Sequence, residues 1–252
     1  SQRGRAWVEY QPLGVIGILS PWNYPFLLAM VPLATALAAG NRAMLKPSEL
    51  TPETSALMKT MLAEAFPEDK IAVVLGDPGV GAEFSGLPFD HLFFTGSTQV
   101  GRLVMKAASE NLVPVTLELG GKSPTIILPG HVNARNVASI VFGKLANAGQ
   151  TCVAPDYVFV HESEVEAFID AFDKAVARSY PDGVASRDYA SIISDRHFSR
   201  LEGLLEDAVS NGAMARQVGR DAWAGTRTRV FPPTLVINPT DKMAFCLLYT
   251  SP

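Results

Sequence analysis

Residues 91–101 read His-Leu-Phe-Phe-Thr-Gly-Ser-Thr-Gln-Val-Gly in a chain of 252 residues. The apolar run at 91–95 predicts a buried strand, and Gly96 and Ser97 predict a turn into a helix. Backbone N–H groups at such a helix start favour an anion, so a pyrophosphate is a natural ligand here. The glycine spacing is neither the G-x-G-x-x-G fingerprint nor a P-loop, however. Taken alone, these residues are better explained as an ordinary turn capped by Ser97.

On both sides of this segment, short β-rich runs alternate with longer helical patterns. Such alternation predicts an α/β fold in which helices wrap a parallel sheet. In the N-terminal half we expect strands at 13–19, 43–46, 71–75, 91–95 and 115–119, helices at 30–39, 51–65 and 98–109, and a glycine-rich turn at 76–81. In the C-terminal half we expect strands at 123–128, 157–160 and 234–237, and helices at 132–148, 163–179 and 196–211.

The pattern restarts at the glycine pair Gly120-Gly121, which predicts a domain boundary. We expect residues 1–119 to form a cofactor-binding domain and residues 120–245 to form a second α/β domain. No recognisable continuation follows Phe245, so we expect residues 246–252 to be a tail that is not native sequence.

Composition excludes several classes of function. The chain is 48% hydrophobic and 18% charged with a net charge of -4, which is typical of a globular protein and argues against a nucleic-acid partner. The apolar run at 26–39 is too short for a membrane span. Two cysteines and four histidines show no metal-ligand spacing, so we expect no metal. The low cysteine content fits a reducing compartment, and we expect a cytoplasmic location.

Polar residues follow two of the predicted strands. The sequence Lys46-Pro-Ser48-Glu49 comes after the strand at 43–46, where open α/β sheets bind ligands. A lysine and a carboxylate there suit the hydroxyls of a ribose, although a solvated loop explains them as well. In Pro21-Trp-Asn-Tyr-Pro25, the two prolines stiffen the loop that holds Asn23. Its amide is placed to donate to an oxyanion, unless the loop merely packs through its aromatic residues.

Two further residues are candidates for a catalytic role. Glu118 lies on the face of its strand opposite Val115, Leu117 and Leu119, and at the end of a buried strand it would suit a general base. A half-exposed strand surface is the alternative. Cys152 lies in Asn147-Ala-Gly-Gln-Thr-Cys152, beyond a long helix. A lone cysteine is usually a small buried hydrophobe, but a polar loop containing glycine is a poor place for packing. That setting favours a nucleophile.

In order and in spacing, five segments resemble the aldehyde dehydrogenase superfamily: PWNYP at 21–25, KPSE at 46–49, FTGST at 94–98, LELGGKSP at 117–124 and GQTC at 149–152. The variant GQTCVAPDYV at 149–158 is similar to the class 3 branch. The stretch DYASII at 188–193, followed by FSRL at 198–201, is similar to bacterial coniferyl aldehyde dehydrogenases. The resemblance implies a parallel Rossmann-type cofactor domain followed by a catalytic domain, both incomplete.

The resemblance also implies a reaction. Cys152 would attack an aldehyde, and Asn23 and the cysteine N–H would hold the resulting oxyanion. Hydride transfer to NAD, or to NADP, would leave a thioester that a water activated by Glu118 hydrolyses. The cofactor-binding residues implied are Lys46, Ser48, Glu49, Gly76, Gly96, Ser97, Gly101, Leu119 and Gly120.

The chain departs from the family pattern at both ends. The downstream acidic and Phe-Gly-Pro element is absent, and so is the first part of the cofactor domain, so we expect a fragment of an enzyme whose full-length form is a homodimer or homotetramer. Three alternatives remain: an acylating enzyme that passes the acyl group to coenzyme A, a thiol hydrolase or acyltransferase, and an inactive dinucleotide-binding chain. Glu118 favours hydrolysis over the first, and the ribose and phosphate motifs speak against the second.

Overall fold

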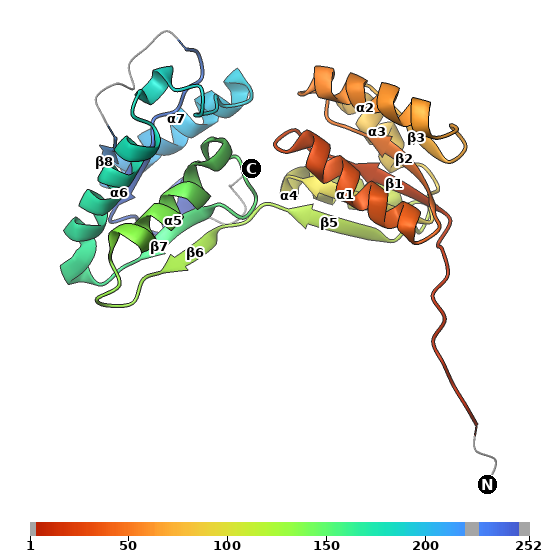
Figure 1. Ribbon diagram of the computed structural model, residues 1–252, viewed down its shortest axis with the longest axis horizontal. Helices are drawn as coiled ribbons and strands as arrows, with labels where there is room; N and C mark the ends of the chain where they lie inside the picture. Colours follow the sequence, from red (N-terminus) through yellow and green to blue (C-terminus); the bar gives the residue numbers. More distant parts are fainter. Residues whose placement is uncertain (1–3, 220–226, 247–252) are drawn as a thin grey trace. The chain divides into compact units, whose positions relative to one another are not determined.

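The computed structural model describes residues 4–219 and 227–246, and the chain divides into two compact units, Ser1–Leu119 and Gly120–Pro252 (Figure 1). Each unit has its own hydrophobic core. The expected tail at 246–252 lies outside the described residues except for Cys246.

The N-terminal unit is built on a sheet of five parallel strands in the order β3-β2-β1-β4-β5. The strand order reverses between β1 and β4, and this switch point is where open sheets of this kind bind ligands. The predicted parallel α/β sheet is therefore confirmed. The strands are β1 (Val15–Leu19), β2 (Arg42–Lys46), β3 (Ile71–Val73), β4 (His91–Gly96) and β5 (Val115–Leu119).

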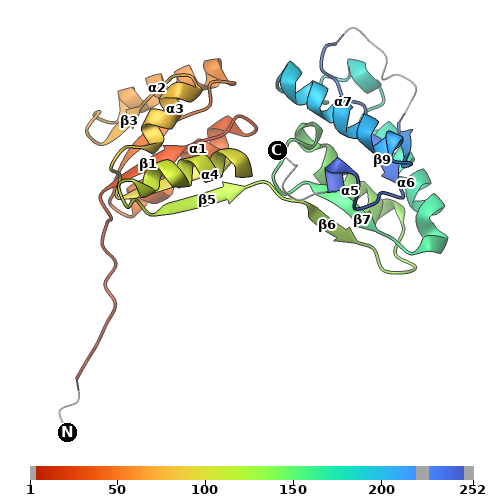
Figure 2. The ribbon, with the colours of Figure 1, turned by 180° about the vertical axis from the view of Figure 1, so that it is seen from behind.

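Helices cover both faces of this sheet. The helices α1 (Pro25–Ala38) and α2 (Pro52–Ala65) share one core cluster with Ile16, Ile18 and Leu45. The helices α3 (Pro78–Ser85) and α4 (Thr98–Ser109) contribute to a second cluster on the other face, so α1 is in front in Figure 1 and α4 in front in Figure 2. Alternate residues of β1 point to opposite faces, as the period of a strand requires.

Proline and aspartate at helix starts explain where the structure corrects the sequence prediction. The predicted turn at 76–81 instead enters helix α3, because Asp77 caps it by accepting a hydrogen bond from Val80 N at 3.2 Å and Pro78 occupies the first turn. Helix α1 begins at Pro25 rather than at residue 30 because this proline suits the first turn, although no side chain caps the helix. Thr51 occupies the N-cap position of α2, but its side chain makes no capping bond to the helix.

The C-terminal unit pairs β6 (Ser123–Ile126) with β7 (Pro155–Phe159) in parallel, and β8 (Met214–Gln217) with β9 (Thr234–Ile237) in antiparallel fashion. Its helices are α5 (Ala134–Leu145), α6 (Val165–Ser179) and α7 (Asp195–Ser210), and its core is built mainly from apolar residues of α5 and α6. The short 3-10 helices are Ala146–Gly149, Glu162–Glu164, Gly183–Ala185 and Ala244–Cys246. The sequence did not predict β8.

Helix α5 is shorter than the predicted helix at 132–148. It ends at Leu145 because Asn147 and Ala148 take positive φ angles of 51° and 54°, which reverse the chain. Left-handed conformations are costly for residues with a side chain, and an apolar pattern gives no sign of them.

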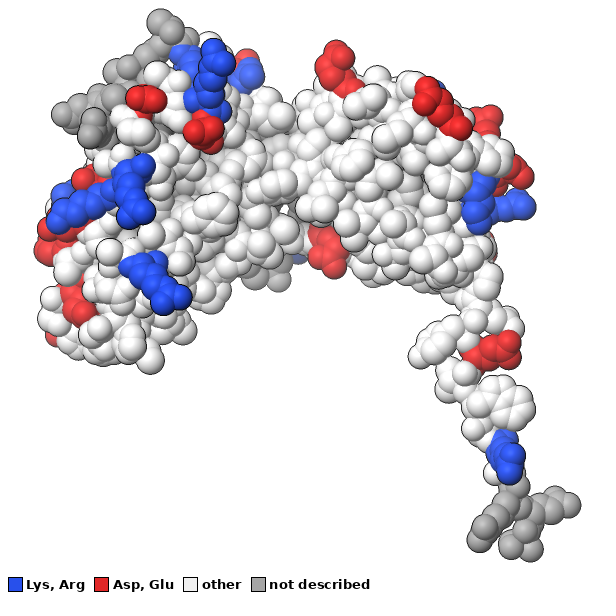
Figure 3. All heavy atoms as spheres, viewed as in Figure 1, with Lys and Arg blue, Asp and Glu red and all other residues white. Residues whose placement is uncertain are grey.

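Surface charge is mixed. On the face drawn in Figure 3, acidic and basic side chains are interspersed among uncharged ones. Within residues 4–219 and 227–246, no helix is both long and apolar enough to cross a membrane. In the same part of the chain, no group of three or more histidine, cysteine, aspartate or glutamate residues is arranged to hold a metal ion.

Candidate active site

The candidate residues of the N-terminal unit collect at the carboxyl edge of its sheet. The strand register places Leu19, at the end of β1, beside Lys46 on one side and Phe94 on the other. The segments that leave β1 and β4 at this edge are those that carry Asn23 and Ser97. At the end of β5, Glu118 pairs with Thr95 and Leu119 pairs with Gly96. The structure thus brings these residues to one edge, at the switch point.

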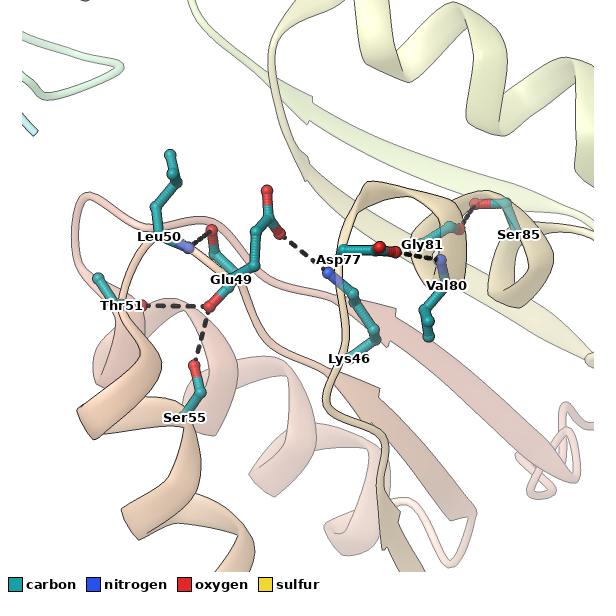
Figure 4. Close-up of polar contacts among 10 residues, drawn as sticks. Lys46, Glu49, Leu50, Thr51, Ser55, Asp77, Val80, Gly81 and Ser85 are labelled. Carbon is teal, nitrogen blue, oxygen red and sulfur yellow. Dashed lines mark hydrogen bonds and ion pairs between the residues drawn. The ribbon is translucent and has the colours of Figure 1, made fainter. Parts of the chain in front are cut away.

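Lys46 and Glu49 form an ion pair beside the start of α3. The Lys46 side chain is buried, with the residue only 4% exposed, and its Nζ lies 3.0 Å from Glu49 Oε2. Figure 4 shows this pair against the turn at Asp77 and Gly81, where a Cβ on Gly81 would lie 3.8 Å from Lys46 Cε. The loop is therefore an ordered part of the unit, and the alternative of a solvated loop is wrong for Lys46.

Ser48 is also buried and holds the start of α2. Its carbonyl oxygen accepts a hydrogen bond from Ser55 Oγ at 2.9 Å, and its Oγ accepts one from Leu50 N at 3.2 Å (Figure 4). These bonds fix the backbone of the 46–49 segment, so the Lys46 and Glu49 side chains start from a rigid base.

The glycines of this edge allow close packing. A Cβ on Gly76 would lie 2.5 Å from the Val80 side chain, and one on Gly96 would lie 2.5 Å from the Phe94 ring. A Cβ on Gly101 would lie 2.9 Å from Leu119 Cδ2, so this glycine lets α4 approach β5 closely. Each glycine therefore has a packing role that is independent of any ligand.

Ser97 caps α4, as predicted. Its Oγ accepts a hydrogen bond from Val100 N at 3.3 Å, and its carbonyl oxygen accepts one from Gly101 N at 2.8 Å. The N–H groups of Thr98 and Gln99 precede the first intrahelical bond and point beyond the helix start. They are the donors that an anion at this position would use.

The sequence did not predict a role for Ser20, whose hydroxyl is buried at the switch point. Ser20 follows β1 directly and is 7% exposed, and its Oγ has no hydrogen-bond partner among the described residues. A buried polar atom without a partner carries a free-energy cost that a ligand would remove. The only signal in the sequence is a small polar residue at the end of an apolar strand.

Asn23 and Glu118 differ in exposure. Asn23 is half-buried in the short connection between β1 and α1, where Pro25 starts the helix. Glu118 is exposed on β5, which is the edge strand of the sheet, while Val115, Leu117 and Leu119 pack against the core. The predicted alternation along β5 is confirmed, and the exposure of Glu118 fits the half-exposed strand surface better than the end of a buried strand.

Cys152 belongs to the C-terminal unit and is exposed. It ends a tight turn, residues 146–152, which we call the thiol turn. Positive φ angles at Asn147, Ala148 and Gly149 reverse the chain, and Thr151 N donates to Gly149 O at 2.8 Å. An exposed thiol is not a packing residue, so the buried alternative for Cys152 is wrong. Gly120 is the first residue of the same unit.

Charged side chains gather at the base of the thiol turn. Lys122 forms an ion pair with Asp156 at the start of β7, and the aliphatic end of Lys144 would lie 3.7 Å from a Cβ on Gly149. Burial lowers the pKa of the Lys144 ammonium, the nearby Asp156 carboxylate opposes that shift and Lys122 adds to it. The sequence analysis did not name Lys144, which the structure places in the last turn of α5.

Comparison with known proteins decides the family. The sequence matches the aldehyde dehydrogenase family over residues 1–247. This chain belongs to the aldehyde dehydrogenase family. It is 50% identical to a probable coniferyl aldehyde dehydrogenase of Caulobacter vibrioides over 242 residues, which are 95% of this chain and 50% of that protein. It is 49% identical to the coniferyl aldehyde dehydrogenase of a Pseudomonas species over 240 residues, 94% of this chain and 50% of the relative.

Solved aldehyde dehydrogenases share the fold. The substrate-bound structure of Staphylococcus aureus AldH matches with a TM-score of 0.83 and 41% identity, over 93% of this chain and 50% of that one. The Mycobacterium tuberculosis aldehyde dehydrogenase in complex with NAD+ matches with a TM-score of 0.81 and 32% identity, over 95% of this chain and 50% of the other. The chain therefore spans about half the length of the family members that it matches.

Proposed function

We propose that this chain carries the catalytic residues of an NAD(P)-dependent aldehyde dehydrogenase that oxidises an aromatic or aliphatic aldehyde, of the coniferyl aldehyde type, to the carboxylic acid. The observation that carries the proposal is the exposed Cys152 thiol at the end of a tightly turned segment in a chain of this family. Two relatives that share about half of its residues bear the name coniferyl aldehyde dehydrogenase, which supports the substrate class.

The N-terminal unit fits a dinucleotide. Lys46 and Glu49 offer a cation and a carboxylate to the hydroxyls of the adenosine ribose, with Ser48 between them in the sequence and Gly76 just before the Asp77 turn. The first turn of α4 at Ser97 offers backbone donors to the pyrophosphate, with Gly96 and Gly101 in the same segment. Leu119 pairs with Gly96 across the sheet, and Gly120 follows Leu119 in the chain. The orphaned Ser20 hydroxyl at the switch point supports a ligand there. When bound, NAD or NADP accepts the hydride that the reaction removes from the substrate carbon.

The residues then have distinct tasks. The Cys152 sulfur, as a thiolate that has given up its proton to water, forms a bond to the aldehyde carbon, and the Asn23 amide and the Cys152 N–H donate to the oxygen that becomes negative. Loss of hydride from that carbon leaves a thioester on Cys152. Glu118 removes a proton from water, which attacks the thioester and releases the acid and the free thiol. An exposed carboxylate such as Glu118 has access to water for this step.

We further propose a homodimer or homotetramer in a reducing, cytoplasmic compartment. Large apolar side chains are exposed on the C-terminal unit, among them Phe142 at 78%, Ile126 at 68% and Phe159 at 58%. Exposed apolar residues of this size are typical of surfaces that another subunit covers. Both cysteines are free thiols, and the proposed chemistry needs Cys152 to stay reduced.

The test uses the whole protein with NAD and a cinnamaldehyde-type substrate. We expect NADH and carboxylic acid in equal amounts, loss of both in Cys152→Ala with NAD binding retained, and unchanged turnover in Cys246→Ala. Substantial turnover in Cys152→Ala would exclude Cys152 as the nucleophile. A coenzyme A thioester in place of the acid, when coenzyme A is added, would replace our proposal with the acylating reaction.

A further inference from the structure

An irregular segment at 186–193, which we call the strap, lies against the thiol turn within the C-terminal unit. A single side chain joins the two. Gln150 Nε2 donates to Asn147 O at 3.0 Å and to Ser191 O at 3.2 Å, and Gln150 Oε1 accepts from Ile193 N at 2.9 Å. One amide therefore closes the thiol turn on itself and also fastens it to the strap.

The strap is itself held by groups from further along the chain. Arg229 Nε donates to Ile192 O at 2.9 Å, and Ile192 N donates to Arg229 O at 2.8 Å. Arg227 donates to the carbonyl oxygens of Ser186 and Tyr189. Two strap side chains, Tyr189 and Ile192, are buried with exposed fractions of 2% each. The strap is thus fixed through backbone bonds, two guanidinium groups and the core.

Hydrogen bonds and short stretches of backbone connect Arg229 with the nucleophile. Arg229 holds Ile192, the neighbouring Ser191 and Ile193 hold Gln150, and Gln150 is two residues from Cys152. We propose that Gln150 and Arg229 are positioning residues, which act through the strap to fix the place of the Cys152 thiol. This inference rests on the proposed role of Cys152 as nucleophile.

The physical reason is that the thiol turn, although it has backbone bonds of its own such as Thr151 N to Gly149 O, keeps a strained conformation. Asn147 and Ala148 adopt left-handed conformations that cost free energy and persist only when the surroundings impose them. Without the three bonds of Gln150, the turn would relax and the thiol would move. A misplacement of about 1 Å costs roughly 10²-fold in rate.

The test compares matched variants of the whole protein. Gln150→Glu keeps the side-chain length and the acceptor for Ile193 N, but it sets a carboxylate against the carbonyl oxygens of Asn147 and Ser191. Arg229→Met removes the guanidinium bond to the strap. Arg216→Met is the control, since Arg216 is another arginine of this unit, whose two ion pairs to Glu166 and Asp170 are long at 3.9 Å.

Hydrogen exchange of the peptide 147–154, followed by mass spectrometry, measures directly how well the backbone amides of the thiol turn are protected. We expect it to speed up about tenfold in Gln150→Glu and Arg229→Met, the effect of roughly one lost hydrogen bond, and to stay unchanged in Arg216→Met. We also expect kcat to fall by up to roughly 10²-fold with the KM for NAD unchanged, and Arg229→Lys to recover part of it.

Equal exchange and equal kcat in Arg229→Met and Arg216→Met would overturn the inference. So would a joint change of kcat and of the KM for NAD, which would indicate general destabilisation. If Gln150→Glu does not fold, the test rests on the variants of Arg229, which is only partly buried. Absence of turnover in the parent protein would count against the proposed function, while the exchange measurement would still test the coupling.

Discussion

Glu118 and Asn23 have separate tasks in the proposed reaction, and single substitutions distinguish them. Glu118→Gln keeps the shape of the side chain but cannot take a proton from water, so we expect hydrolysis of the thioester to slow by roughly 10²–10⁴-fold. A burst of NADH and an acyl group on Cys152 should follow. Asn23→Ala removes one oxyanion donor, so we expect acylation itself to slow by about 10²–10³-fold, with no burst.

Rapid-quench kinetics and intact-mass measurements provide the readout for both variants. An acyl adduct that accumulates in Asn23→Ala and not in Glu118→Gln would reverse the two assignments. Full activity in either variant would remove that residue from the mechanism.

Glu49 should set the choice between the two nicotinamide cofactors. Its carboxylate lies 3.0 Å from the Lys46 ammonium, and the 2′-phosphate of NADP would bring a second negative charge to the same place. We therefore expect a higher kcat/KM with NAD than with NADP, and a smaller ratio in Glu49→Gln. Equal kcat/KM values for the two cofactors in the parent protein would contradict this prediction.

At the scale of the element, the glycine in the middle of β1 stands where the core has no room for a side chain. A Cβ on Gly17 would lie 2.6 Å from the Phe89 ring and 2.7 Å from Leu92 Cδ1. We expect Gly17→Ala to lower the free energy of unfolding by about 1–3 kcal/mol, the usual cost of overpacking a core.

Gly203 provides the matched control. It lies inside α7, and a Cβ there meets no atom within 4 Å. We expect Gly203→Ala to raise the free energy of unfolding by roughly 0.5–1 kcal/mol, because alanine favours a helix more than glycine does. Urea unfolding of both variants is the measurement. A Gly17→Ala protein as stable as the parent would show that the Phe89 ring moves aside at little cost.

The elements that the sequence predicted well are those with a regular apolar or alternating pattern. Strand β5 has the predicted bounds, and so does β9. Helix α3 was missed because its eight residues include two glycines, and only the Asp-Pro pair before them marks its start. The reversal at Asn147 and Ala148 was missed because its conformation is imposed by contacts with distant residues, such as those between Gln150 and the strap.

The residues of the candidate site were also only partly predictable from the sequence. Motif residues such as Lys46, Ser97 and Cys152 are visible in the sequence because their types and neighbours are unusual for packing. Ser20 and Lys144 are not visible, because their interest comes from burial. Ser20 Oγ is buried without a hydrogen-bond partner among the described residues, and burial lowers the pKa of Lys144. Burial of a polar group depends on tertiary packing, which a local pattern does not report.

At the scale of the whole molecule, the cofactor candidates and the thiol belong to different units. Among the cofactor residues, all but Gly120 lie in the N-terminal unit, and Cys152 lies in the C-terminal one. We expect NAD to stabilise the N-terminal unit, by about 2.7 kcal/mol at a free concentration of 100 times Kd. Hydrogen exchange should therefore slow in peptides that cover 46–49 and 96–101.

The core of α5 and α6 serves as the internal reference, because its contacts are made within the C-terminal unit. We expect its exchange to change less than that of the N-terminal peptides. Protection confined to the C-terminal unit would place the cofactor elsewhere and would remove Lys46, Glu49 and Ser97 from its site.

The strand order of the N-terminal sheet also has a consequence for biosynthesis. The ribosome makes β1 before β2 and β4, yet β1 ends in the middle of the sheet, between these two strands. One edge of β1 therefore stays unpaired until residues 91–96 have left the exit tunnel, an interval of several seconds at ~5–20 residues per second. During that time Ile16 and Ile18 lie beside an open edge, and such an edge invites pairing with other chains. Fast synthesis of residues 20–96 shortens this exposure, and a chaperone that covers the open edge protects the nascent chain until β4 arrives.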